Sequence, residues 1–325
     1  MADRPTIGTT SFSPGWHERR PMSEYLADPA ASASMLWKLH TTTPAHFIED
    51  YGGDEETVAK RLGSVLHARL FEPATFDQYV VLGPCEAELK SGERKGEKCG
   101  KQGSVFRDGH SFCGTQGHDP YGKDEPMAPG IEVVTASQKR DAIAMEAALR
   151  KDREINELLE AEGPREVIGV WQDKETGLWL RIRPDMLIAE PAATPARWHW
   201  SVPNLKSTGK VARGEAFRRD FENLGNHFKA AVYRLGMREL WPVEPQNFLY
   251  PTVETYAPYA TILHRIHEDW LDIAEDDVRH TLRALADCLD ADHWPAYGGG
   301  IHDLNLPEWR RKRLDVIDDV VEVAA

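Results

Sequence analysis

Apolar residues recur at intervals of three and four in five stretches of the chain, a spacing that gathers them on one face of a helix. Two of these stretches lie in the first half, at residues 55–71 and 135–162. Three lie in the second half, at residues 214–223, 227–240 and 267–289. The pattern predicts a helix in each of them.

Between these helical stretches the apolar positions alternate, which is typical of β-strands. Residues 166–171 and 178–188 flank a polar turn at residues 173–177, so we expect a hairpin. On its second strand one face carries Leu178, Leu180, Ile182, Met186 and Ile188, and the other carries Trp179, Arg181, Arg183 and Asp185. A third strand is expected at residues 198–206. The order of helix, strands and helices predicts an α/β or α+β fold, with a central mixed sheet flanked by helices.

Residues 83–126 differ from the rest of the chain, because they are rich in Gly, Lys and Cys and lack an aliphatic repeat. Within them Cys85, Cys99, Cys113 and His118 follow the spacing C-x13-C-x13-C-x4-H. A segment without an apolar core can fold around a tetrahedral site of thiolate and imidazole ligands. We therefore expect these four residues to bind Zn²⁺ in a small inserted module that is similar to treble-type zinc motifs.

Other interpretations of the cysteines stay open. His110 is an alternative fourth ligand, and the thiols could instead be unrelated free cysteines in a loop. An iron–sulfur cluster that recruits Cys288 is a further alternative. However, Cys288 shares an apolar helical face with Leu282 and Leu285, as core residues do. Zinc is the favoured metal.

The composition is that of an ordinary soluble protein, 41% hydrophobic and 28% charged over 325 residues, with room for one large domain or a domain and a small module. The chain has no apolar run long enough to span a membrane, and its polar start lacks the core of a signal peptide. We therefore expect a cytoplasmic protein that makes no membrane contact.

The net charge of −14 argues mildly against a nucleic-acid partner, because phosphate binding favours a basic surface. Basic clusters nevertheless occur at residues 90–101, 206–219 and 310–313. Basic residues can line a channel while acidic ones lie outside, so the charge does not exclude DNA as a substrate.

Two short motifs near the ends of neighbouring predicted strands carry the chemistry of a candidate active site. They are RPD at residues 183–185 and NLK at residues 204–206. Since side chains alternate along a strand, residues 204 and 206 project to one side, where they can face Asp185. Phosphodiester hydrolysis requires carboxylates that hold Mg²⁺ and a cation that orients water or stabilises charge. Alone, such a pair of motifs arises often by chance.

Further motifs follow one another along the chain in the order found in one nuclease family. They are GSVLH at 63–67, LFEP at 70–73, Glu166, ETG at 175–177, RIRPD at 181–185, KST at 206–208, His227, Tyr233, WPAY at 294–297 and LPEW at 306–309. In this order and spacing the chain resembles the RecE-type (exonuclease VIII-like) nucleases of the PD-(D/E)XK superfamily. The resemblance covers about residues 32–309, interrupted by residues 83–126.

The resemblance implies the PD-(D/E)XK fold and a Mg²⁺- or Mn²⁺-dependent exonuclease that degrades double-stranded DNA from its ends in the 5′-to-3′ direction. It further implies that Asp185 is the central metal ligand and that residue 204 is the second. The carbonyl of Leu205 and the side chains of His67 or Glu166 would complete the metal shell. Lys206 would handle the attacking water.

Contacts to DNA are expected from basic residues after the catalytic strand and from one helix beyond it. The basic residues are Lys210, Arg213, Arg218 and Arg219. On the helix, Lys229 and Tyr233 lie one turn apart and can face the same groove.

Two residues depart from the family's pattern. Position 204 is Asn where the family has Asp or Glu, and position 229 is Lys where it has Gln. An Asn oxygen can touch a metal but brings no charge, so both Mg²⁺ affinity and water activation should fall. Three explanations are open: an engineered inactive enzyme, which we favour, a naturally silenced homologue, or a shifted ligand. Pro203 removes a ladder donor beside this position, which predicts an edge strand or a bulge there.

We expect three parts in the chain: an N-terminal extension at residues 1–31, a nuclease domain at residues 32–82 and 127–325, and the zinc module at residues 83–126. The resemblance implies a role in phage or prophage recombination, a homo-oligomeric ring around DNA and a single-strand annealing protein as partner. The alternative functions are a non-catalytic DNA-binding or regulatory protein on this fold, and an endonuclease or nickase of the same superfamily.

Overall fold

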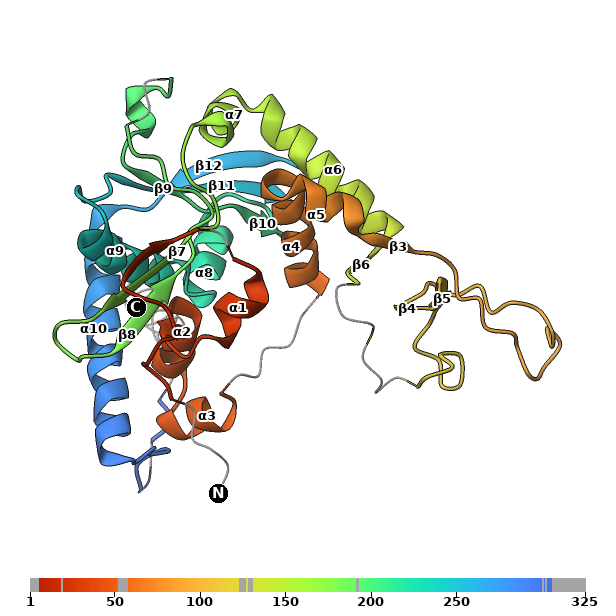
Figure 1. Cartoon of the computed structure of the whole chain (residues 1–325), viewed down its shortest axis with the longest axis horizontal. Coiled ribbons are helices and arrows are strands. Elements are labelled where there is room, and N and C mark those ends of the chain that lie inside the picture. Colours follow the sequence, from red (N-terminus) through yellow and green to blue (C-terminus); the bar gives the residue numbers. More distant parts are fainter. Residues whose placement is uncertain are drawn as a thin grey trace, which may run out of the picture.

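A computed structural model of the chain describes residues 6–18, 20–51, 58–122, 127, 131–190, 193–299, 301 and 303–305. Two four-stranded sheets form the centre of the molecule, with helices on both sides (Figure 1). Among the described residues no helix combines the length and apolar character needed to cross a bilayer.

The first sheet has the strand order β1-β7-β8-β2. Its hairpin consists of β7 (Ile168–Gln172) and β8 (Trp179–Ile182), as the alternating pattern predicts. At its two edges lie β1 (Gly15–His17), antiparallel to β7, and β2 (Ala31–Ser32), parallel to β8. Residues that we assigned to an N-terminal extension therefore add strands to this sheet.

The second sheet is built around β11 (Asn247–Glu254). Along one edge of β11 run β9 (Ser201–Pro203) and then β10 (Lys206–Thr208), both parallel to it. On the other edge lies the antiparallel strand β12 (Thr261–Arg265). An isolated bridge joins Ser201 of β9 to Ile188, six residues after the end of β8. The central sheet is therefore mixed, as predicted.

Helices cover both faces of the sheets. On one side lie α2 (Ala33–Thr41), α9 (Asn226–Leu240) and α10 (Glu268–Ala291), which share an apolar core with strand residues such as Ile182 and Phe248. On the other side lie α4 (Val58–Phe71), α6 (Ala136–Lys151) and α7 (Arg153–Glu160), which pack on Leu249 and Val253. Since neighbouring residues of β11 point to opposite faces, this strand is buried on both sides.

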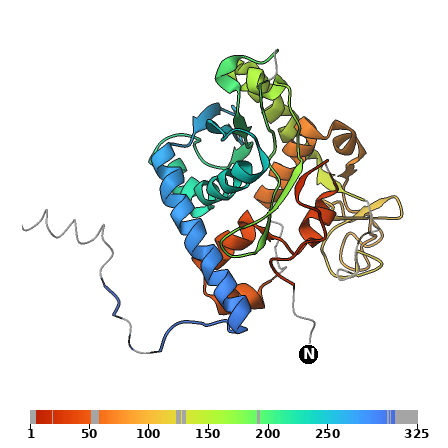
Figure 2. The same cartoon turned by 60° about the vertical axis from the view of Figure 1, so that its left-hand side comes forward.

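Shorter elements complete the chain. The helices are α1 (Met22–Ala27), α3 (Pro44–Glu49), α5 (Pro73–Gln78), α8 (Glu215–Asn223) and the 3-10 turn η1 (Ala196–Trp198). The strands are the parallel pair β3 (Val80–Leu82) and β6 (Val133–Thr135) and the antiparallel pair β4 (Val105–Arg107) and β5 (His110–Phe112). Figure 2 shows the segment between β3 and β6 on the opposite side of the molecule from α10.

Three elements are shorter than their apolar patterns predict. The helix expected at residues 135–162 is divided at Asp152, whose side chain accepts hydrogen bonds from the first turn of α7. The strand expected to reach residue 188 ends at Ile182, just before Pro184. The strand expected at residues 198–206 is divided between β9 and β10. Its register against β11 is nevertheless unbroken, so Pro203 ends a ladder without introducing a bulge.

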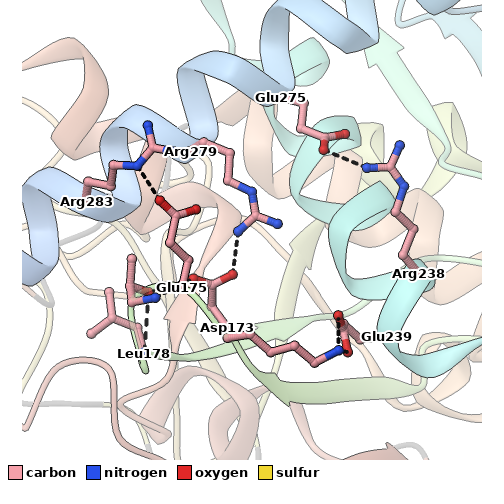
Figure 3. A network of polar contacts seen from close by, with 10 residues as sticks. Asp173, Glu175, Leu178, Arg238, Glu239, Glu275, Arg279 and Arg283 are labelled. Atoms are coloured by element: carbon pink, nitrogen blue, oxygen red, sulfur yellow. Dashed lines mark hydrogen bonds and ion pairs between the residues drawn. The ribbon is translucent and has the colours of Figure 1, made fainter.

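Ion pairs fix the β7–β8 hairpin to the two long helices (Figure 3). The turn residue Asp173 pairs with Arg279 of α10 at 2.5 Å, and its amide donates to the Leu178 carbonyl at 2.8 Å. On the same side, Glu175 pairs with Arg283, also of α10. The hairpin that leads to the RPD motif is thus anchored at its far end.

Candidate active site and cysteine cluster

Three side chains from separate parts of the sequence meet at one point. His67 lies in α4, with Nε2 3.5 Å from Asp185 Oδ2 and Nδ1 3.4 Å from Glu166 Oε1. Asp185 follows β8 and Glu166 precedes β7. The ligand atoms of all three lie within 4.8 Å of one another, so a single cation could contact the whole group.

The local sequence explains this convergence. Val65 and Leu66 are fully buried on α4, which leaves His67 at the margin of the core. The Glu166 amide donates to the Asp185 carbonyl at 3.2 Å, so the two carboxylate residues are joined by their backbones. Side-chain exposure rises from 8% at Glu166 to 16% at Asp185 and 31% at His67. The group therefore opens to solvent at His67.

Glu166 is held in a costly backbone conformation. Its φ of 55° lies in the left-handed region, which a non-glycine residue adopts at a cost of about 1–3 kcal/mol. Its carboxylate pairs with Arg183 at 2.7 Å, and Arg183 also approaches Glu72 at 3.8 Å. These contacts hold Glu166 in place. Arg183 and Glu72 lie in the RPD and LFEP motifs, and neither was predicted to act in the site. The signal in the sequence is the parity of Arg183 with Asp185.

Lys206 completes the site from β10. Burial lowers the pKa of Lys206, against the attraction of Asp185, which raises it. Its ammonium lies 5.9 Å from the centre of the Tyr250 ring. Between β9 and β10, the amide of Leu205 donates to Asp185 Oδ2 at 2.6 Å, so this backbone turns toward the site.

Asn204 is buried and its side chain bonds to its own strand. The amide nitrogen Nδ2 donates to the Val202 carbonyl at 3.4 Å, and the residue is 6% exposed. The geometry therefore brings together the imidazole of His67 and the carboxylates of Glu166 and Asp185, and Asn204 lies in the link between β9 and β10.

His67, Glu166 and Asp185 are largely shielded from solvent, so burial and the neighbouring charges set the direction in which each pKa moves. Burial raises the pKa of Asp185, and the neighbouring Glu166 adds to this effect. Burial alone would lower the pKa of His67, but Asp185 and Glu166 outweigh it and the pKa is raised. Burial likewise acts to raise the pKa of Glu166, yet His67 and Arg183 lower it overall. Two carboxylates and one imidazole form a donor set that suits a divalent cation.

The residues expected to contact DNA fall into two groups. Arg218 and Arg219 are exposed on α8 and both pair with Glu215, while Lys210 pairs with Asp220. Arg213 is exposed in the loop before α8. Tyr233 is half-buried on α9, and its hydroxyl donates to the Arg183 carbonyl at 2.9 Å. Tyr233 thus positions the RPD segment.

The α9 helix also carries Lys229 and His227, which differ in exposure. Lys229, one turn before Tyr233, is partly exposed. His227 is buried between Trp37 and Trp270, with its ring stacked on Trp270 at 5.5 Å.

The cysteine cluster lies in the segment between β3 and β6. Cys85 and Cys99 face each other across a hairpin, since Cys85 donates its amide to Lys101 and Gly100 donates to the Cys85 carbonyl. Cys113 follows β5. The β4–β5 turn has positive φ at both Asp108 and Gly109, as tight two-residue hairpins require. Two hairpins and a loop therefore carry the four predicted ligands.

The distances among the four predicted ligands fit a tetrahedral zinc site. Tetrahedral zinc with ordinary bond lengths separates two sulfurs by about 3.8 Å, and a sulfur from a nitrogen by about 3.6 Å. The Cys99 and Cys113 sulfurs are 3.9 Å apart. His118 Nδ1 lies 3.7 Å from Cys85 Sγ and 3.4 Å from Cys113 Sγ. All four ligand atoms lie within 4.8 Å of one another.

The alternative ligands lie elsewhere. His110 is exposed and its Nδ1 lies 3.2 Å from Glu86 Oε2. Cys288 is buried in α10, and this helix lies on the far side of the molecule from the segment between β3 and β6 (Figures 1 and 2). Of the two histidines, the structure places His118 with the three thiols, and it separates Cys288 from them.

Residues 32–306 match the family described as "PDDEXK-like domain of unknown function (DUF3799)". The chain belongs to this PDDEXK-like family. A match of this length includes His67, Glu166, Asp185 and Lys206, and PD-(D/E)XK nucleases use divalent metals. No curated protein matches the chain.

The PDDEXK-like chain also has the fold of a solved structure, that of a "Putative exonuclease" from Eubacterium rectale. The TM-score is 0.50 at 12% sequence identity, and the match covers 85% of this chain and 89% of that one. The fold is thus that of a PD-(D/E)XK nuclease.

Proposed function

We propose that the protein is a metal-dependent DNA exonuclease of the RecE type, which degrades double-stranded DNA from its ends in the 5′-to-3′ direction. The observation that carries the proposal is the convergence of His67, Glu166 and Asp185 beside Lys206, within a PDDEXK-like fold. The name of the Eubacterium rectale protein also favours an exonuclease.

In this proposal Asp185 is the central ligand of Mg²⁺ or Mn²⁺, supported by His67, Glu166 and the carbonyl of Leu205. The metal, when bound, supplies a Lewis acid for the scissile phosphate and its attacking water. Lys206 orients that water and offsets the charge that develops on the phosphate. A desolvated lysine with a lowered pKa is suited to exchanging a proton there.

Asn204 limits this chemistry. Because Glu166 is already paired with Arg183, the charge that it offers to a cation is partly neutralised. With a neutral amide at position 204, the site holds Mg²⁺ weakly and cleavage is slow or absent. Asn204 is also the observation that favours a second function, a non-catalytic DNA-binding or regulatory protein on the nuclease fold.

The cysteine cluster is proposed to hold a structural zinc ion, with Cys85, Cys99, Cys113 and His118 as ligands. Four protein ligands leave no open position for catalysis, which is the character of a structural site. Further proposals from the RecE resemblance are a homo-oligomeric ring, a single-strand annealing partner, a role in phage recombination and a cytoplasmic location.

A nuclease assay on linear duplex DNA tests the function. We expect the chain to degrade DNA very slowly with Mg²⁺ or Mn²⁺, and Asn204→Asp to raise the rate by about 100-fold or more. The matched control is Asn204→Asp combined with Lys206→Ala, which should lose the gain. Rapid digestion by the unmodified chain that survives Lys206→Ala would contradict the site, and an Asn204→Asp protein that binds but never cuts DNA would favour the non-catalytic function. A circular duplex distinguishes the endonuclease or nickase alternative.

A further inference from the structure

Arg181 is a buried cation whose hydrogen-bond donors are left unpaired. It lies on β8 and is 2% exposed. Within the part of the chain that the structure describes, its Nε and Nη1 have no hydrogen-bond partner. Its Nη2 contacts a thioether, Met35 Sδ, at 3.8 Å. Buried polar groups are nearly always paired in folded proteins, so an unpaired guanidinium points to a partner that is not part of the chain.

The arginine lies against the first turn of α2. Ser32 of β2 is its neighbour in the sheet, and Met35 is the third residue of the helix. The Ser32 hydroxyl caps this helix by accepting from the Met35 amide at 3.3 Å. The other amides of a first helical turn point outward and carry partial positive charge. A guanidinium and a helix N-terminus side by side favour an anion between them.

The carboxylate of Asp28 acts on Arg181 but already has hydrogen-bond donors of its own. Burial of the guanidinium lowers the pKa of Arg181, against the smaller opposite effects of Tyr25 and Asp28. The Asp28 oxygens accept hydrogen bonds from Thr10, Ser11 and Ala30 instead. The charge of Arg181 is thus left without a paired anion.

The short helix α1 covers this place. Its Tyr25 ring lies 4.5 Å from the Arg181 guanidinium, and its Met22 sulfur accepts from Arg183 Nη1 at 3.4 Å. None of the six residues of α1 is buried. A helix that buries so little apolar surface can move at low cost compared with a core helix. The contacts that α1 makes with Arg181 and Arg183 are therefore uncharged, and a phosphate could replace them.

The position of Arg181 relates it to the proposed active site. Arg181, Arg183 and Asp185 share one parity along the same segment. Four residues of chain span at most about 14 Å, so a strand whose scissile phosphate lies at Asp185 can present another phosphate to Arg181.

We propose that Arg181 and the first turn of α2 form a subsite for a phosphate group of the DNA strand, which α1 covers when no strand is bound. The subsite rests on the proposed nuclease function and adds to it a point of contact away from the metal. The phosphate is either the terminal one at a strand end or an internal phosphodiester, and both bring the same oxyanion.

Binding of three linear duplexes, measured in Ca²⁺ without cleavage, tests the subsite. The duplexes carry a 5′-phosphate, a 5′-hydroxyl or a 3′-phosphate and are otherwise identical. We expect Arg181→Met to weaken binding by about tenfold, the loss of a charge-assisted contact. The matched control is Arg238→Met. Arg238 lies near the end of α9 and is paired with Glu244 and Glu275. A loss confined to one phosphorylated end identifies a terminal phosphate, and an equal loss for all three identifies an internal one.

Two further measurements guard against a purely structural effect. Arg181→Met removes unpaired buried donors, so its melting temperature should stay level or rise while its DNA affinity falls. Tyr25→Ala opens the cover and should strengthen binding by about threefold or more. Unchanged affinity in both Arg181→Met and Tyr25→Ala, with all proteins folded, overturns the subsite.

Failure of the subsite and failure of the nuclease are separable. If Asn204→Asp cuts DNA at a rate that Arg181→Met leaves unchanged, and binding is unchanged as well, the nuclease stands and the subsite falls. If no variant cuts DNA but Arg181→Met still weakens binding of phosphorylated duplexes, the subsite stands and the nuclease falls.

Discussion

At the scale of single residues, the candidate site is dominated by the chemistry of position 204. The Asn204 amide donates to the Val202 carbonyl inside the protein. A carboxylate in its place cannot donate, so it would face an acceptor and remain unpaired unless a cation reaches it. The same substitution that should restore activity should therefore make the protein depend on metal.

We predict that Asn204→Asp lowers the stability of the metal-free protein by about 1–3 kcal/mol, the cost of an unsatisfied buried polar group. Mg²⁺ or Mn²⁺ should then restore its melting temperature more than they raise that of the unmodified chain. Thermal melts with and without each metal measure this. The control is Asn226→Asp, since Asn226 is also buried, but in α9; equal metal responses in the two variants would contradict the assignment.

A second residue-scale prediction concerns Gly225, which precedes α9. Its φ is 66°, and a Cβ built there would lie 2.4 Å from the Trp37 ring. Gly225→Ala should therefore destabilise the protein by more than about 1 kcal/mol, because both the backbone and the contact are unfavourable. Gly177→Ala is the matched control, since Gly177 also has a positive φ of 72° but has open space around its Cβ position. Urea denaturation should show the larger loss at Gly225.

At the scale of elements, the stretches that the apolar pattern singled out are of the predicted type, but their limits differ and the strands β11 and β12 were not predicted. The helix expected at residues 135–162 is two helices, because the Asp152 side chain begins a new one in mid-pattern. Apolar spacing cannot reveal such a division when both helices bury the same face. Similarly, the alternation through residues 198–206 continues across the break between β9 and β10, since the register against β11 is kept.

The candidate site was predictable in part. The RPD and NLK motifs came from the alternation along the predicted strands, and His67 came from the resemblance to the RecE-type nucleases. The structure brings His67, Glu166 and Asp185 together. The ion pair between Arg183 and Glu166 and the hydrogen bond from Tyr233 to the Arg183 carbonyl depend on tertiary contacts. Periodicity says which face a residue occupies but not which residue lies opposite it.

The module between β3 and β6 gives an element-scale prediction. We expect about one zinc ion per chain, and Cys99→Ser should release it and unfold the two hairpins. Elemental analysis measures the metal, and amide hydrogen exchange across residues 83–122 measures the order. Cys288→Ser is the control, because Cys288 lies in α10 and should leave the zinc content unchanged. Iron in place of zinc, or no metal, would contradict the zinc assignment.

At the scale of the whole molecule, a net charge of −14 must be reconciled with a DNA substrate. Many basic residues are neutralised locally, as Arg218 and Arg219 are by Glu215. Binding to DNA would have to compete with these pairs. Exposed ion pairs contribute little to stability, so breaking them for a phosphate costs little.

We predict that reversing the charge of Arg218 and Arg219 together weakens binding to linear duplex DNA and reduces its salt dependence, because fewer phosphate contacts release counterions. Titrations at several salt concentrations give the slope. The matched control reverses Arg140 and Arg153, which are exposed and paired with acidic residues on α6 and α7. If both double variants show the same slope, the basic residues of α8 are only solvated surface, and residues 90–101 become the next candidate channel.

The cysteine module joins the core through two closely spaced ends, and this spacing bears on how the module could be gained or lost in evolution. The chain leaves at the end of β3 and returns at the start of β6, and these strands are direct neighbours. Adjacent strands lie about 4.8 Å apart, so the points of departure and return are only about 8 Å from each other. A cassette with such closely spaced ends can be gained or lost in one genetic event without repacking the interior. Relatives that lack the cysteines should therefore carry a short connection here and an otherwise unchanged nuclease.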